Sequence, residues 1–250
     1  MKKLLEISCY SVRDTLNAQG GGADRVELCA GRPEGGTTPS YGSIVMCREQ
    51  LTIPLFVIIR PRGGDFLYSE LEFEEMKRDI AFCKEAGVDG IVSGILHADG
   101  TVDKERSREL IELARPLAFT FHRAFDMTRD PYEALDDLIE IGADRVLTSG
   151  QEATAVKGQE LIRRLIKRAG DRIIIFPGGD LDENNLEAFA RYTGAREYHA
   201  AAGTLHEGGM KFRNPRIHMG GMEGIPEYEI WEADTEKIRK MADILRKAGI

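Results

Sequence analysis

The sequence predicts an α/β protein folded as a single (β/α)8 TIM barrel. The chain has 250 residues, the usual size of one such barrel. Apolar, strand-like runs alternate throughout with segments whose apolar residues recur at helical spacing. The expected strands begin near Leu4, Arg25, Leu55, Gly90, Leu117, Arg145, Ile173 and Glu197. We therefore expect residues 1–250 to form one barrel domain, with a long loop at residues 205–234 after the last strand.

The helices between these strands carry recognisable start signals. Ser11 is followed three residues later by Asp14, a pair similar to a capping box. Asp130 precedes Pro131, which suits the first position of a helix. Apolar residues at helical spacing predict further helices over 72–86 and 157–169, and a last helix over 235–246 completes the ring.

A short repeat supports the count of eight strands. The run Gly22-Ala23-Asp24-Arg25-Val26 recurs identically at 142–146, and related versions stand at 87–91 and 194–198. Each run precedes an even-numbered strand, so its glycine can end the preceding helix in the left-handed conformation. Such turns recur in many barrels, but a period of two βα units fits an eight-fold architecture.

Composition narrows the class of protein. The net charge of −8 gives no basic surface for nucleic acid. No apolar run is long enough for a membrane span, and Glu6 interrupts the short apolar start that a secretion signal would need. The cysteines show no Cys-x-x-Cys spacing, so we expect reduced thiols in a cytoplasmic protein; they are Cys9, Cys29, Cys47 and Cys83.

Alternation of side chains along each strand sorts the barrel interior from the helix-facing side. This alternation turns Glu6, Glu27 and Glu197 inward on neighbouring strands, with Arg60 beside them. His122 reaches in from the far side. These groups could form an internal ion network or a functional site. Glu27, Arg60 and His122 lie nearest the carboxyl ends of their strands, where barrel enzymes keep catalytic residues.

The loops after the strands add further candidates. Arg60 and Arg62 are a plausible clamp for a carboxylate or phosphate. Glu27 or His122 is a candidate acid or base, with Asp126 orienting Arg123 or His122. The full set of candidate catalytic residues is Glu27, His122 and Asp126, and the candidate anion-binding residues are Arg60, Arg62, Arg123, Ser149, Gly178, Gly179 and His199.

Five stretches of this sequence carry a family likeness. They are Gly22–Cys29, Glu34–Gly42, Ile59–Tyr68, Thr120–Asp126 and Leu147–Gly150. Together they resemble the signature blocks of the CutC copper homeostasis family, and the likeness extends from about Leu4 to His199. The resemblance implies a TIM barrel, a cytoplasmic location, a homodimer or higher homo-oligomer, and a link to copper.

The resemblance also implies copper ligands, and here the chain departs from the family. Members usually have a cysteine at the position of Ser8 and sometimes a second at Cys9, used together with the cysteine matching Cys29. By alternation Cys9 faces away from Cys29 unless the strand ends or bulges there. Cuprous ion prefers soft sulfur ligands, so one inward thiol would need a second molecule to complete the site. The final loop holds further soft or borderline ligands at irregular spacing, which we interpret as packing residues: His206, Met210, His218, Met219 and Met222.

Three functions remain open at this level. The chain could bind copper through Cys29, with or without Cys9. It could instead be an enzyme acting, at the mouth of the barrel, on a small anionic metabolite that carries a phosphate or a carboxylate, such as a sugar phosphate. A non-catalytic sensor would use the same pocket without turnover, and the fold alone does not choose among these functions.

Overall fold

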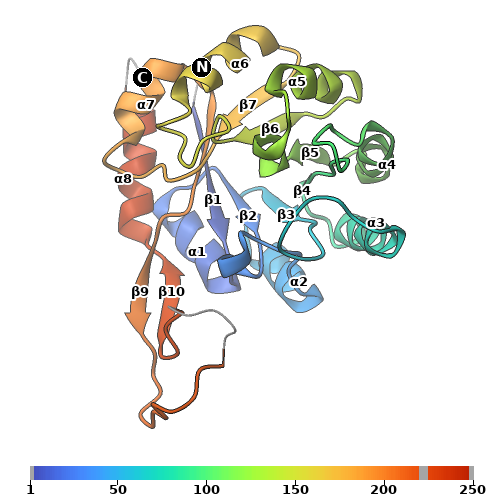
Figure 1. The fold of residues 1–250 in the computed structure, drawn as a ribbon. Coiled ribbons are helices and arrows are strands. Elements are labelled where there is room, and N and C mark those ends of the chain that lie inside the picture. Colours follow the sequence, from blue (N-terminus) through green and yellow to red (C-terminus); the bar gives the residue numbers. More distant parts are fainter. Residues whose placement is uncertain (1–2, 220–224, 248–250) are drawn as a thin grey trace.

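A computed structural model describes residues 3–219 and 225–247 and confirms the TIM barrel (Figure 1). Eight parallel strands run in the order β7-β6-β5-β4-β3-β2-β1-β8. A parallel bridge between Gly178 and His199 joins the end of β7 to β8 and brings the two edges of the sheet together. The strands are β1 (Leu4–Cys9), β2 (Arg25–Leu28), β3 (Leu55–Ile58), β4 (Gly90–Ser93), β5 (Ala118–Phe121), β6 (Arg145–Thr148), β7 (Ile174–Pro177) and β8 (Glu197–Ala200).

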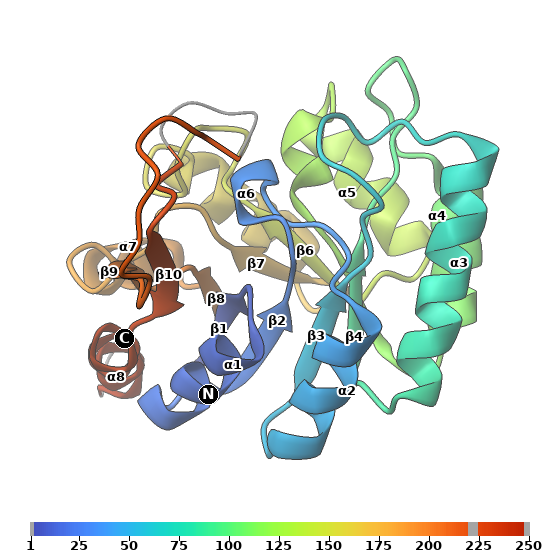
Figure 2. The ribbon, with the colours of Figure 1, turned by 90° about the horizontal axis from the view of Figure 1, so that it is seen from below.

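Helices surround the strands and cover their outer face (Figure 2). The α-helices are α1 (Val12–Gly21), α2 (Tyr41–Gln50), α3 (Glu70–Glu85), α4 (Lys104–Ala114), α5 (Pro131–Glu140), α6 (Gln159–Ala169), α7 (Leu186–Thr193) and α8 (Thr235–Arg246). Two short 3-10 helices, η1 (Arg32–Glu34) and η2 (Arg123–Met127), follow β2 and β5. The expected starts of β5 and β7 differ from the observed ones by one residue, as is usual at the ends of elements.

The hydrophobic core consists of an outer and an inner cluster, as the alternation of side chains along the strands predicts. Leu5, Ile7 and Val26 belong to the large cluster between strands and helices. Cys29, Phe56, Ile58 and Val92 form a separate small cluster inside the barrel. The interior is therefore only partly apolar, and its remaining space is lined by polar side chains.

The predicted helix caps and turn glycines are confirmed. The Ser11 hydroxyl accepts a hydrogen bond from the Asp14 amide, and the Asp130 carboxylate caps α5 ahead of Pro131. The glycines before β2, β4, β6 and β8 all have positive φ angles: 89° at Gly22, 74° at Gly87, 82° at Gly142 and 67° at Gly194. A left-handed residue therefore separates each of these strands from the helix before it.

The segment after β8 differs from the expected loop. It contains an antiparallel hairpin of β9 (Gly203–Glu207) and β10 (Glu229–Ala233). We call residues 203–233 the arm, of which 220–224 lie outside the described residues. Figure 1 shows the arm extending away from the barrel. The Trp231 ring packs over Gly203, and its centre lies 3.6 Å from the Arg32 guanidinium. These contacts hold the base of the arm against the barrel.

Within the described residues, no helix is both long enough and apolar enough to span a membrane.

Candidate functional site

The polar interior opens into a cavity at the carboxyl ends of the strands, with a volume of about 240 Å³. Glu27 of β2, Arg60 after β3 and His122 after β5 all line it, as the register predicted. The cavity is also lined by polar, aromatic and glycine residues from other loops and strands: Ser8, Tyr10, Cys29, Phe66, Arg123, Gly179, Asp180 and His199. The cavity therefore lies where TIM-barrel proteins place their binding residues.

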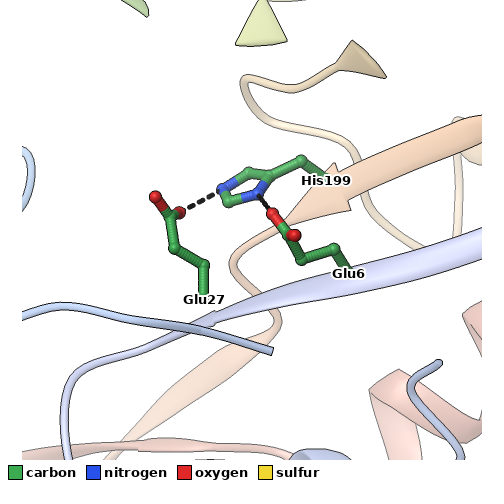
Figure 3. A group of neighbouring side chains, drawn as sticks. All are labelled: Glu6, Glu27 and His199. Carbon is green, nitrogen blue, oxygen red and sulfur yellow. Dashed lines mark hydrogen bonds and ion pairs between the residues drawn. The ribbon is translucent and has the colours of Figure 1, made fainter. Parts of the chain in front are cut away.

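One wall of the cavity holds a histidine between two carboxylates (Figure 3). His199 Nδ1 lies 2.8 Å from Glu6 Oε1, and His199 Nε2 lies 3.7 Å from Glu27 Oε2. The strand register explains this arrangement, because Glu6 is opposite His199 on β8 while Ser8 is opposite Glu27 on β2. Ligand atoms of these three residues lie within 4.8 Å of one another, so they could hold one metal ion.

The two carboxylates of this wall have opposite pKa shifts. Burial would raise the pKa of Glu6, but the charge of Arg25 and the hydrogen bond with His199 lower it to about 2. Burial raises the pKa of Glu27 to about 7, because the nearby His199 offsets only part of the desolvation. Burial would lower the pKa of His199, yet its hydrogen bond to Glu6 and the charge of Glu27 raise it. The wall is therefore arranged to hold a proton near neutral pH.

An arginine that the sequence reasoning did not single out supports this wall from below. Arg25 Nε pairs with Glu6, and Arg25 Nη2 lies 2.9 Å from Glu197 Oε2. Arg145 Nε lies 3.0 Å from the same Glu197 oxygen. The expected ion network is present, but Arg25 and Arg145 provide its cations rather than Arg60. The available signal was alternation: Arg25 lies two residues before Glu27 and so shares its inward face.

Arg60 instead holds the loops above the barrel. Its Nη1 donates to the carbonyls of Glu34 and Gly36 at 2.7 and 2.8 Å, and its Nη2 donates to the carbonyl of Gly64 at 2.9 Å. The Tyr68 hydroxyl is also near this guanidinium, but the buried Nε atom has no well-aligned hydrogen-bond partner among the described residues. Within that same part of the chain, no carboxylate forms an ion pair with Arg60. This guanidinium therefore brings an unneutralised positive charge to the cavity.

His122 is the second buried donor of the cavity. Its Nδ1 accepts a hydrogen bond from the Ala124 amide at 3.2 Å, so the proton of the neutral ring is on Nε2. Burial and the neighbouring Arg60 lower the pKa of His122 to about 3, which keeps the ring neutral. Its buried Nε2 also has no hydrogen-bond partner among the described residues.

Asp126 lies outside the cavity lining and anchors the neighbouring loop. Its carboxylate accepts hydrogen bonds from the Ser149 amide at 2.9 Å, from Thr148 Oγ1 at 2.5 Å and from the Gln151 amide at 3.1 Å. It also orients Arg123, whose Nε lies 2.8 Å away and which does line the cavity. Ser149 is buried beneath Arg123 and accepts a hydrogen bond from it at 2.7 Å. Asp126 and Ser149 therefore position Arg123 and do not face the cavity themselves.

Two other candidates for anion binding are engaged elsewhere. Arg62 pairs with Glu72 at 2.5 Å and with Asp65 at 3.1 Å, and it is not among the residues that line the cavity. The Gly178 amide donates to the Thr148 carbonyl at 3.0 Å, so it is not free for a phosphate. Gly179 has a φ of 117° and lines the cavity. Of the two candidate glycines after β7, Gly179 therefore lines the cavity and Gly178 does not.

The two cysteines predicted to bind copper lie on opposite faces of the barrel wall. Cys29 lies inside the barrel beside Glu27, and its thiol is within hydrogen-bonding reach of that carboxylate. Cys9 is the last residue of β1, its register with β2 has no bulge, and its side chain lies in the outer cluster. Burial and the charge of Glu27 raise the pKa of Cys29 well above its usual value. A single chain therefore does not bring these two thiols to one copper ion.

The soft ligands of the arm do not pack as expected. Met210 and Met219 are exposed, as are His206 and His218, and Met222 lies outside the described residues. Among the described residues, the methionines do not belong to the hydrophobic core clusters, and the two histidines do not belong to a group of histidine, cysteine and carboxylate side chains that could hold a metal ion.

Comparisons with known proteins agree with this architecture. A solved structure of a CutC protein from Streptococcus agalactiae is 33% identical, with a TM-score of 0.76, and the match covers 79% of this chain and 98% of that one. Phosphoribosyl anthranilate isomerase from Thermotoga maritima matches with a TM-score of 0.58 over 98% of both chains at 12% identity, which shows a shared fold alone.

Proteins related in sequence have a higher identity to this chain than the solved structures above. The human "Copper homeostasis protein cutC homolog" is 47% identical over 243 residues, covering 97% of this chain and 89% of the relative. A CutC protein of Parabacteroides distasonis is 50% identical over 240 residues, covering 96% and 99%. The sequence model of the CutC family matches residues 3–204, which end at the start of the arm. The chain therefore belongs to the CutC family.

Proposed function

We propose that this protein takes part in copper homeostasis and binds a copper ion at the mouth of the barrel. The observation that carries the proposal is the family membership, together with the human relative named for copper homeostasis at 47% identity. The cavity supplies a thiol, an imidazole and two carboxylates within one small volume.

Cys29 is the proposed soft ligand for the ion. Thiolate is the side-chain donor that cuprous ion prefers, and imidazole is the next best suited. His199 and Glu27 are the nearest further donors, since Glu27 lies beside both Cys29 and His199. Because Cys29 holds its proton tightly, copper binding must release that proton, and affinity should rise with pH.

An anaerobic titration with cuprous ion against a competing chelator tests this proposal. Cys29→Ser should weaken binding at least about tenfold, since only the thiolate is a soft donor. Cys9→Ser is the matched control, because Cys9 is equally buried but faces the helices. Unchanged copper affinity and stoichiometry in Cys29→Ser would refute the proposed site.

We also propose a cytoplasmic location and a homo-oligomeric state. The four cysteines are free and buried, as in proteins of reducing compartments. Exposed apolar side chains of the arm, including Phe212 and Ile217, supply a contact surface for a second copy. Cell fractionation checks the location, and the oligomer is tested as described in the Discussion. The acid–base roles of Glu27 and His122 stay predictions.

A further inference from the structure

Two buried hydrogen-bond donors in the cavity have no partner in the described part of the chain. They are Arg60 Nε and His122 Nε2, and both side chains are more than nine-tenths buried. An unpaired buried donor costs roughly 1–3 kcal/mol, and more when the group is charged. Such donors are retained where a ligand satisfies them.

The two donors both lie next to Phe66, and we call these three side chains the donor wall of the cavity. The Arg60 guanidinium lies 5.1 Å from the centre of the Phe66 ring, and the Phe66 and His122 ring centres are 4.9 Å apart. All three side chains line the cavity. Phe66 thus packs against both donors and restricts how each can turn.

The charge on this wall indicates the kind of ligand. Arg60 is a permanent cation whose Nη atoms are fixed on loop carbonyls rather than on carboxylates. A buried charge without a counter-ion is strongly unfavourable. The ligand group that satisfies this wall is therefore an anion that accepts two hydrogen bonds.

A carboxylate fits this wall better than a phosphate. The wall offers two single donors rather than the several donors that a phosphate needs. The other nearby donors are engaged. The Gly178 amide donates to the Thr148 carbonyl. The Arg123 guanidinium is held by Asp126 and Ser149.

Glu27 and His199 also line the cavity, where they would bond to hydroxyl groups of the ligand, and the Glu27 carboxylate would repel a dianion. Of the phosphate- and carboxylate-bearing metabolites that the sequence leaves open, this wall therefore favours a small, singly charged carboxylate.

We propose that the cavity binds a small organic carboxylate, with Arg60 Nε and His122 Nε2 donating to its two oxygens. The ligand's other end faces Glu27 and His199. This site shares Glu27 and His199 with the proposed copper site, but its two donors, Arg60 and His122, are not among the proposed copper ligands.

Acetate is the minimal probe, and acetamide is its neutral match. The full chain, treated with chelator and labelled with 15N at histidine, is titrated while the His122 Nε2 resonance is followed by NMR. Acetate should shift this resonance saturably, and acetamide should bind at least about tenfold more weakly. Inorganic phosphate should bind more weakly than acetate.

Variants separate the donor from the fold. His122→Asn keeps a side-chain acceptor for the Ala124 amide but removes the Nε2 donor, so the acetate Kd should rise about 10- to 100-fold. His206→Asn is the matched control, because His206 is exposed on β9. If His122→Asn does not fold, the titration of the wild type still decides.

The proposal is overturned by no shift of His122 Nε2 with acetate, by an equal response to acetamide, or by tighter binding of phosphate. None of these results affects the copper titration, which uses Cys29 and is done without carboxylates.

Discussion

The buried charges of the barrel depend on one arginine. Arg25 joins Glu6 to Glu197 and lies 4.5 Å from the Phe56 ring centre, so it fills the barrel floor as well as neutralising it. Removing one partner of a buried ion network leaves the others desolvated and unpaired. Arg25 holds the Glu6 carboxylate in place, and Glu6 in turn holds the His199 ring. The geometry of the cavity therefore depends on Arg25.

We therefore expect Arg25→Met to lower the free energy of unfolding by about 3–5 kcal/mol, measured by urea denaturation. Arg13→Met is the control: Arg13 is exposed and 3.8 Å from Glu232, so its loss should change stability by less than about 1 kcal/mol. Equal stability of Arg25→Met and wild type would show that the network does not support the barrel.

The raised pKa of Glu27 makes stability depend on pH. In the folded protein Glu27 keeps its proton up to a pH of about 7, whereas the unfolded chain releases it near 4.5. The folded state therefore binds more protons between these values, and this contribution to stability is present at low pH and lost as pH rises through 7.

The side chain of the Glu27→Gln variant is neutral at every pH, so the variant should not show this loss of stability as the pH rises. The free energy of unfolding of the variant minus that of the copper-free wild type should rise by on the order of 1–3 kcal/mol between pH 5 and pH 8. Denaturation at both pH values measures it, and taking the difference cancels other titrating groups such as His122. A pH-independent difference would mean that Glu27 titrates normally.

At the scale of elements, the turns before the even-numbered strands depend on glycine. Gly87 has a φ of 74°, and a Cβ there would meet no atom within 4 Å. Any cost of a side chain at this position thus comes from the backbone conformation alone, which L-residues adopt at roughly 1–2 kcal/mol.

Gly87→Ala should accordingly lower the free energy of unfolding by about 1 kcal/mol. Gly20→Ala is a matched control with equally free space, but Gly20 lies within helix α1, so that change should stabilise by roughly 0.5–1 kcal/mol. Opposite signs of the two effects in thermal or urea unfolding verify the prediction, and a stabilising Gly87→Ala contradicts it.

The strands and most helices were predictable because local signals specify them. Periodicity, the caps at Ser11 and Asp130 and the left-handed glycines act over a few residues, and alternation then placed Glu27 and His122 in one cavity. The hydrogen-bond and ion-pair partners of the arginine side chains were not predictable. Arg60 and Arg62 were expected to act together at one anion site, but Arg60 lines the cavity whereas Glu72 takes up Arg62. Such choices depend on loop conformations that no short pattern encodes.

At the scale of the whole molecule, the arm is an addition to the TIM barrel. The family match ends at residue 204, and the solved CutC structure from Streptococcus agalactiae covers 79% of this chain but 98% of its own. The arm exposes several large apolar side chains: Leu205, Met210, Phe212, Ile217, Met219, Ile225 and Ile230. Apolar side chains gathered on a projecting hairpin are typical of a contact surface.

If the arm joins two copies of the chain, charges placed on it should separate them. We expect the wild type to elute as a dimer or larger assembly in size-exclusion chromatography with light scattering, and the double variant Phe212→Asp, Ile217→Asp to elute as a monomer, because burying two carboxylates at an interface is strongly unfavourable. Leu71→Asp, at an even more exposed apolar side chain on α3, should leave the assembly intact. A monomeric wild type, or a double variant that keeps its mass, would exclude the arm as the interface, and circular dichroism of both variants verifies that the barrel itself stays folded.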